Sequence, residues 1–158
     1  MALARPTERV APAPRINETV IPVRFHEVDQ MRVVHHSYYL VYMEVARFAF
    51  AARALGVTQA ELDAWGVQVP VRRCECEYLH PARFGDSVRV AVYVRPRPEA
   101  ALHLSYRLYR EADGRLLATG RTVNVFLNRE GRLLLNTPPP LRERLERALR
   151  EHPEIVEG

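Results

Sequence analysis

The pattern of apolar residues changes once along the chain, from a helical spacing to a strict alternation. Residues 37–55 are apolar on nearly every side of a helix, and Gly56 stands where such a helix would end. A helix of this kind has to be wrapped by other elements. Further along, apolar and polar residues alternate as in antiparallel strands with one face towards solvent, over 71–78, 88–94, 102–108 and 117–127. This order predicts an α+β fold in which a curved antiparallel sheet wraps around one long central helix.

Shorter signals complete this outline. A strand is expected over residues 18–26, with Pro22 at an edge or bulge. Thr58 and Glu61 have the spacing of a capping box at the start of a short helix. A C-terminal surface helix is expected over residues 139–150. We therefore divide the chain into a flexible tail, a single domain and a C-terminal tail: 1–16, 17–150 and 151–158.

The composition is that of an ordinary globular protein, with 47% hydrophobic and 27% charged residues among 158. This length can bury a core without disulfides or metal. Cys74 and Cys76 would point to one face of a strand about 7 Å apart, poor geometry for a disulfide, so we interpret them as small apolar core residues. No segment has the roughly 20 apolar residues of a membrane span. These features favour a reducing, cytoplasmic location and no membrane partner.

The chain is basic, with a formal net charge of +4, and all 23 of its basic residues are arginine. Nucleic acid has to be considered as a partner for such a chain. However, the arginines are interleaved with Glu and Asp, and no nucleic-acid-binding motif accompanies them. We therefore expect no nucleic-acid partner and a surface suited to a phosphorylated small molecule.

A candidate catalytic carboxylate, Asp29, lies one short loop before the long helix. The first amides of a helix have no partner within it and carry partial positive charge, so they can polarise a carbonyl and stabilise an oxyanion. A nearby carboxylate can attack that carbonyl or activate water against it. Thioesters suit such a site because a thiol, with a pKa of about 8.5, is a good leaving group. On residue types alone, a loop Asp is more often a turn or capping residue.

Two segments of the sequence form a recognisable pair: DQMRVVHHSYYLVYMEVAR over residues 29–47 and YLHPARFGD over residues 78–86. They resemble the signature of the 4-hydroxybenzoyl-CoA thioesterase family, especially its short-chain acyl-CoA thioesterases. The resemblance extends over residues 19–136 and implies the hotdog fold, with Asp29 as the catalytic carboxylate and the backbone N–H of His36 directed at the thioester carbonyl. It also implies an acyl-CoA substrate, no cofactor, and channels between the subunits of a homodimer or homotetramer.

Two residues depart from the family pattern. Arg32 stands where the family usually has Gly, which permits positive φ or close approach of substrate. Tyr38 replaces a commonly small or polar residue, so the acyl pocket is expected to be reshaped. Arg32 either binds a phosphate or acyl carboxylate at the entrance or faces solvent. We assign substrate binding to Arg32, Val34, Tyr39 and Glu44.

Other interpretations of the same residues remain open. In other hotdog branches a helical acidic residue performs the chemistry, which makes Glu44 a rival to Asp29, although we favour an ion pair between Glu44 and Arg47 one turn later. We expect no metal site, because adjacent histidines such as His35 and His36 need not converge on an ion. The predicted function is hydrolysis of a small or medium acyl-CoA to free acid and CoA. The alternatives are hydrolysis of acyl groups on a carrier protein, or acyl-CoA binding without catalysis.

Overall fold

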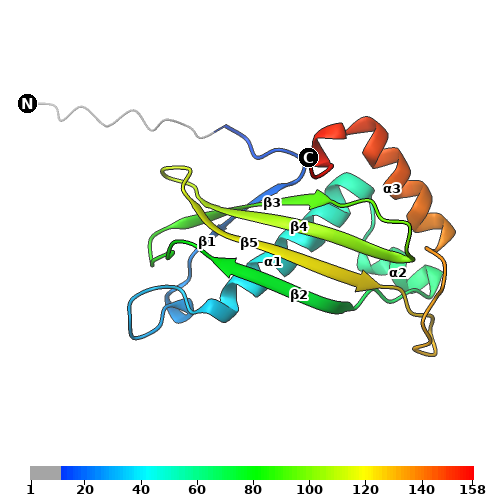
Figure 1. Ribbon diagram of the computed structural model, residues 1–158, viewed down its shortest axis with the longest axis horizontal. Coiled ribbons are helices and arrows are strands. Elements are labelled where there is room, and N and C mark those ends of the chain that lie inside the picture. Colours follow the sequence, from blue (N-terminus) through cyan, green and yellow to red (C-terminus); the bar gives the residue numbers. More distant parts are fainter. Residues whose placement is uncertain (1–11) are drawn as a thin grey trace, which may run out of the picture.

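The computed structural model describes residues 12–158, so most of the predicted N-terminal tail lies outside the described residues. Its antiparallel sheet has the strand order β1-β3-β4-β5-β2 (Figure 1). The strands are β1 (Glu18–Pro22), β2 (Val71–Tyr78), β3 (Ser87–Val94), β4 (Ala101–Arg110) and β5 (Leu116–Val125). The α-helices are α1 (His36–Phe50), α2 (Gln59–Trp65) and α3 (Pro139–Glu151).

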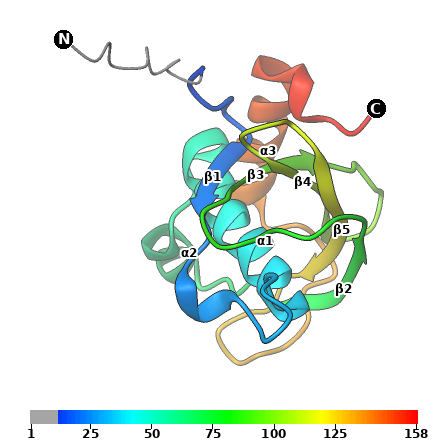
Figure 2. The same ribbon diagram turned by 90° about the vertical axis from the view of Figure 1, so that its left-hand side faces the viewer.

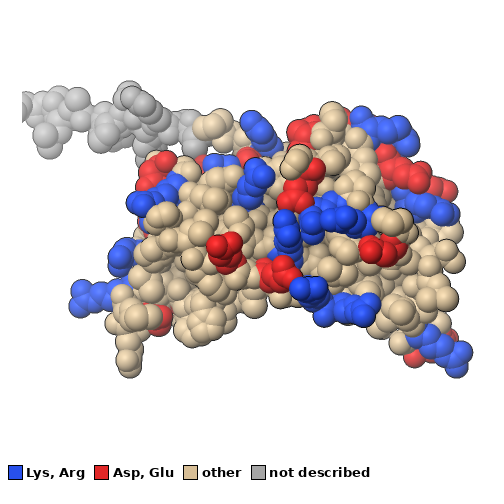
Figure 3. Space-filling view, viewed as in Figure 1, with Lys and Arg blue, Asp and Glu red and all other residues tan. Residues whose placement is uncertain are grey.

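The sheet curves around α1, which lies in its hollow (Figure 2). The alternation in the sequence explains this arrangement, because the inward-facing residues of the central strands form the core. On β3 and β4 these buried side chains are Val88, Val90, Val92, Val94, Leu104, Tyr106 and Leu108. The convex face carries interspersed basic and acidic side chains (Figure 3). The predicted α+β class, a curved antiparallel sheet around one long helix in the hotdog arrangement, is confirmed.

The long helix ends as its sequence predicts, but it is not wrapped on every side. After α1 the chain makes one π-helical turn, Ala51–Leu55, and stops at Gly56, whose φ of 62° is the left-handed conformation that glycine adopts without strain. One face of α1 is buried under the sheet. Four large apolar side chains on another face are exposed: Leu40, Val41, Val45 and Phe48. The prediction that the helix is fully wrapped is therefore wrong for a single subunit.

The inner face of β5 also differs from the expectation. The sequence alternation assigns Val123 and Val125 to the core, but the buried residues are Thr122 and Asn124. These polar groups are hydrogen-bonded in part: Thr122 Oγ1 donates to Asn124 Oδ1 at 3.0 Å and lies 2.9 Å from the hydroxyl of Tyr106, while Asn124 Nδ2 has no partner among the described residues. The two hydroxyls and the amide oxygen are therefore paired, which lowers the cost of burying them where the apolar pattern predicted valine.

The short helices and the C-terminus complete the domain. The capping box of α2 is confirmed: Thr58 Oγ1 accepts from the N–H of Glu61 at 3.4 Å, and the Glu61 carboxylate accepts from the N–H of Thr58 at 3.1 Å. The predicted domain boundary at residue 150 falls inside α3. Beyond that helix, Ile155 is fully buried, so residues 151–158 continue the packed domain.

The two cysteines are free and lie on the edge strand β2. Cys76 packs partly against the core, but Cys74 is exposed. The prediction that both are core residues is wrong for Cys74, because β2 is the last strand of the sheet and no element within the described residues covers its outer side. Among residues 12–158, no helix is long and apolar enough to cross a membrane.

Candidate active site

A short hairpin that leads into α1 carries Asp29 at its tip. Val28 and Val34 form an antiparallel bridge, and the N–H of Asp29 donates to the carbonyl oxygen of Val33 at 2.9 Å. The turn is closed by the N–H of Arg32, which donates to the carbonyl oxygen of Asp29 at 2.9 Å. These backbone bonds fix Asp29 a few residues before the first turn of α1.

The half-buried Asp29 carboxylate has two differently placed oxygens. Oδ1 accepts a hydrogen bond from the N–H of Met31 at 2.8 Å, which is the turn-stabilising role that residue type alone favours. Within residues 12–158, Oδ2 has no hydrogen-bond partner. The turn therefore orients the carboxylate with one oxygen and leaves the other available to a substrate or a water molecule.

The first turn of α1 offers an unpaired amide. His35 caps the helix, because its Nδ1 accepts from the N–H of Ser37 at 3.3 Å and its carbonyl oxygen accepts from the N–H of Tyr38 at 3.0 Å. The N–H of His36 has no acceptor among the residues described. It is a free donor at the positive end of a 15-residue helix.

The underside of this hairpin is held by buried contacts. The N–H of Val34 donates to the carbonyl oxygen of Ala82 at 2.8 Å, and the N–H of Ala82 donates to the hydroxyl of Tyr39 at 3.0 Å. The Tyr78 hydroxyl on β2 donates to the carbonyl oxygen of His36 at 3.0 Å. Val34 and Tyr39 thus belong to the core of the single subunit, with 4% and 3% of their surface exposed. Their contact with substrate stays a prediction.

The rival carboxylate of Glu44 lies in solvent on α1. It is paired with Arg47, whose Nη2 lies 3.5 Å from its Oε1, so the favoured ion-pair interpretation is confirmed. Its predicted contact with substrate stays a prediction, like that of Arg32. Across residues 12–158, no three His, Cys, Asp or Glu side chains lie together in a way that could hold a metal ion.

Arg32 adopts a backbone conformation that side chains rarely occupy. Its φ of 62° is the one positive value for a non-glycine residue in the described part of the chain. The sequence pointed to this position, because Arg32 replaces the Gly that the related signature usually has. The left-handed conformation places Cβ close to the following carbonyl oxygen, so Arg32 stores backbone strain directly beside Asp29.

Replacing Arg32 by Gly should relieve this strain. A left-handed residue with a Cβ costs roughly 1–2 kcal/mol, and part of that gain is lost to the greater entropy of the unfolded Gly chain. We expect the variant's unfolding temperature to rise by roughly 2–4 °C, measured by differential scanning calorimetry. The control is Arg132→Gly, at an exposed loop position with negative φ, which should lower the unfolding temperature. Equal effects of the two substitutions would contradict the assignment of strain.

Glu27 was not anticipated from the sequence. Its side chain is fully buried beneath the hairpin, where it accepts hydrogen bonds from the Tyr42 hydroxyl and from Arg24. Nothing in the sequence around Glu27 distinguishes it from an acidic residue exposed to solvent. The partner that explains its burial, Tyr42, lies on another element 15 residues away.

Comparison with known proteins places this chain in a family. Residues 23–149 match the thioesterase-like superfamily. The chain belongs to this superfamily. Its fold is similar to that of the hypothetical protein TT1821 from Thermus thermophilus, at 37% identity and a TM-score of 0.76, covering 84% of this chain and 98% of that one.

Two further solved structures carry more informative names. One is DHNA-CoA thioesterase from Staphylococcus aureus, at 25% identity and a TM-score of 0.77, covering 89% of this chain and 97% of that one. The other is a thioesterase from Thermus thermophilus in complex with coenzyme A and Zn, at 28% identity and a TM-score of 0.70, covering 83% of this chain and 92% of that one. One of these two proteins is named for a CoA thioester, and the other is a thioesterase whose structure contains coenzyme A.

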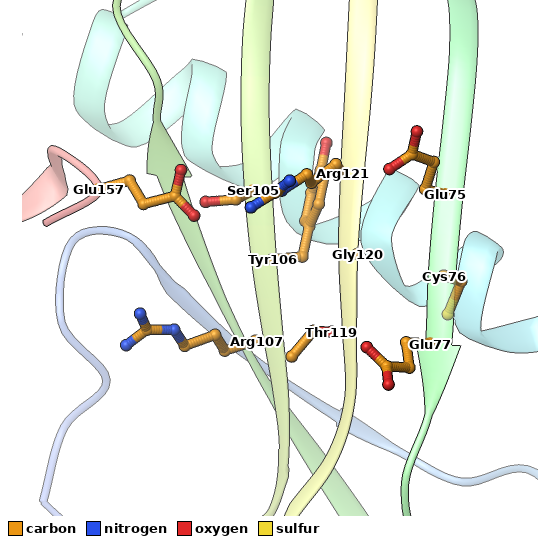
Figure 4. Close-up of a pocket in the computed structure, with 10 residues that line it drawn as sticks. All are labelled: Glu75, Cys76, Glu77, Ser105, Tyr106, Arg107, Thr119, Gly120, Arg121 and Glu157. Carbon is orange, nitrogen blue, oxygen red and sulfur yellow. The ribbon is translucent and has the colours of Figure 1, made fainter.

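Pockets open at several places on residues 12–158 of this thioesterase-like protein, and the predicted site residues line none of those described. An apolar cavity of about 520 Å³ lies beside the π-helical turn at the far end of α1. A hollow of about 420 Å³ lies on the convex face of the sheet between β2, β4 and β5 (Figure 4). Two of the acids lining the hollow are already paired, Glu75 with Arg73 at 2.6 Å and Glu157 with Arg95 at 2.5 Å. The apolar cavity is lined mainly by hydrocarbon side chains.

Proposed function

We propose that this protein hydrolyses acyl-CoA thioesters, with Asp29 as nucleophile or general base and the backbone N–H of His36 as the oxyanion donor. The observation that carries the proposal is the junction between the hairpin and α1. There a carboxylate oriented by its own turn precedes a free helix amide, and the backbone bonds of the hairpin fix the two relative to each other. Membership of the thioesterase-like superfamily supports the same reaction.

The chemistry needs few groups. The His36 amide donates to the thioester carbonyl oxygen, where negative charge develops as the carbonyl carbon becomes tetrahedral. Asp29 either attacks that carbon and forms a mixed anhydride, which water hydrolyses after CoA has left, or removes a proton from a water molecule that attacks the carbon directly. CoA leaves as its thiolate, so no strong acid is required at sulfur. The products are the free acid and CoA.

Self-association completes the site. The edge strand β2 presents unpaired backbone groups on its outer side. Exposed apolar residues lie on α1 and on β2: Leu40, Val41, Val45, Phe48, Val71 and Tyr78. A second copy that pairs its own β2 antiparallel to this one covers both features. A two-fold axis near the middle of β2 then places Val71 opposite the partner's Tyr78.

This pairing gives the apolar cavity a role. Its walls include Phe48, Ala51, Leu55 and Val69, and Pro70 connects it to the start of β2. In the paired arrangement the cavity adjoins the partner's Tyr78, and therefore the first turn of the partner's α1. An acyl group held at one helix start enters the apolar cavity of the other subunit, which is the environment that an alkyl or aromatic chain prefers.

The direct test of this function is release of CoA thiol from a panel of acyl-CoAs of increasing chain length, followed with a thiol-reactive chromophore. We expect saturable turnover that rises with the length of the acyl chain until the cavity is full. If the protein hydrolyses acyl groups only when they are attached to an acyl carrier protein, its substrate is the carrier-protein thioester and not acyl-CoA. Tight binding of acyl-CoA without thiol release from any substrate would contradict hydrolysis.

Filling the cavity should change chain-length preference without changing the chemistry. Ala51→Leu places about three more carbons in the cavity, and each buried methylene contributes about 0.8 kcal/mol. We expect kcat/KM for the longest accepted chains to fall by roughly tenfold or more, while acetyl-CoA turnover stays within about twofold. Ala60→Leu, on exposed α2, is the control and should leave the profile unchanged. A uniform loss over all chain lengths in Ala51→Leu would place the acyl group elsewhere.

A further inference from the structure

Glu27 is a carboxylate that the subunit isolates from water. Its side chain has no exposed surface. Oε2 accepts from the hydroxyl of Tyr42 and from the backbone N–H of Arg24 at 3.1 Å, while Oε1 accepts from Nε of Arg24 at 2.5 Å. Both oxygens are therefore satisfied, and the network leaves no site for a water molecule or substrate to reach the carboxylate.

The surroundings shift the pKa values of both Glu27 and Tyr42. Burial by itself raises the pKa of Glu27, but hydrogen bonds from Tyr42 and Arg24 outweigh it and hold that pKa below its ordinary value. Burial and the adjacent carboxylate raise the pKa of Tyr42. At neutral pH Glu27 is thus an ionised acceptor and Tyr42 a protonated donor, which is the combination that gives short, strong hydrogen bonds.

The position of Glu27 in the chain links two parts of the candidate site. Its side chain binds Tyr42, which lies within α1 about two turns after the helix start. Its backbone carbonyl oxygen accepts from the N–H of His35, the capping residue of α1, at 2.9 Å. Two residues later the chain reaches Asp29 at the tip of the hairpin. One residue therefore connects the hairpin both to the first turn of α1 and to the body of that helix.

We propose that Glu27 is a positioning residue: through its bond to Tyr42 it fixes the position of the Asp29 carboxylate relative to the backbone N–H of His36. This inference rests on the proposed acyl-CoA hydrolysis. The bond ties the segment that carries Asp29 to the body of α1. If it is removed, the hairpin can shift or rotate on α1 while the fold persists, because the backbone bridge between Val28 and Val34 remains. A displacement of about 1 Å between reacting groups is enough to reduce a rate roughly 100-fold.

The test compares two Tyr→Phe variants that remove one buried hydroxyl each. Tyr42→Phe deletes the donor to Glu27, and Tyr106→Phe deletes the bond to Thr122 at 2.9 Å on the sheet side of the core. Both tyrosines are almost fully buried, at 0% and 1% exposed, so the loss of packing is closely matched. Steady-state kinetics over a range of acyl-CoA concentrations up to saturation are measured at a temperature at which circular dichroism shows both variants folded.

We expect Tyr42→Phe to lower kcat by roughly 10- to 100-fold with KM within about threefold, and Tyr106→Phe to keep kcat within about twofold even where its unfolding temperature falls. Arg24→Met, which leaves the fully buried Glu27 without its charged partner, supplies a second variant; it is compared only at a temperature at which circular dichroism shows it folded, and it should lower kcat in the same direction. Unchanged kcat in both Tyr42→Phe and Arg24→Met, in a protein whose wild type turns over acyl-CoA, would overturn the positioning role. Absence of turnover in the wild type would instead overturn the proposed function.

Discussion

Replacing Asp29 by Asn should lower kcat for acyl-CoA hydrolysis by roughly 1,000-fold or more while changing the unfolding temperature very little. The substitution is well suited to this hairpin, because the Asn side-chain oxygen can still accept the N–H of Met31 that Asp29 Oδ1 accepts at 2.8 Å. The turn is therefore kept and only the negative charge is lost. Thiol release and differential scanning fluorimetry on the same preparation give both quantities.

The matched control is Glu44→Gln, which removes the other candidate carboxylate. Glu44→Gln keeps the size of the side chain and removes only its charge, so kcat should fall far less than in Asp29→Asn, and a contact of Glu44 with substrate would be seen as a change in KM. If Asp29→Asn retains turnover and Glu44→Gln loses it, the catalytic carboxylate lies on α1 and the account of the hairpin is wrong. Ala at position 29 is less informative, since it removes the turn bond together with the charge.

Placing a carboxylate on the exposed face of α1 should separate the subunits and abolish turnover. Val45 is 43% exposed in the single chain and lies midway along the apolar face that the proposed second copy would cover. An unpaired carboxylate buried at an interface costs several kcal/mol, and each step of about 1.4 kcal/mol weakens association tenfold. Val45→Asp should therefore raise the dimer dissociation constant by roughly 100-fold or more, as measured by analytical ultracentrifugation. Turnover should fall in parallel with the dimer fraction.

The control for this variant is Leu135→Asp, which makes the same chemical change at a residue 81% exposed in a loop outside the proposed interface. It should change neither the sedimentation coefficient nor kcat. Full activity of monomeric Val45→Asp would show that each chain contains a complete site, and the cross-subunit acyl cavity would then be wrong.

The local elements could be predicted from the sequence because short-range chemistry determines them. The capping box of Thr58 and Glu61, the stop at Gly56 and the bounds of β2 follow from side-chain bonds, positive φ and the alternation of apolar residues. Arg32 belongs with them, since the replacement of an expected Gly drew attention to a backbone that proves to have positive φ.

The errors arose where a residue depends on elements far away in the chain. Thr122 and Asn124 are buried because they bond to each other and to Tyr106, which an apolar pattern does not predict. Glu27 is buried because Tyr42, on α1, donates a hydrogen bond to its carboxylate. The exposed face of α1 reflects a surface that one chain does not cover. The position of Asp29 in a turn before the helix could be predicted, but the residues that hold it in place could not.

The most direct test of the central claim is a crystal structure of Asp29→Asn with a bound acyl-CoA that it hydrolyses too slowly to consume. The account predicts that the thioester carbonyl oxygen lies about 2.7–3.1 Å from the backbone nitrogen of His36, with the side chain at position 29 facing the carbonyl carbon. A thioester bound beside Glu44, or anywhere out of reach of the His36 amide, would contradict it.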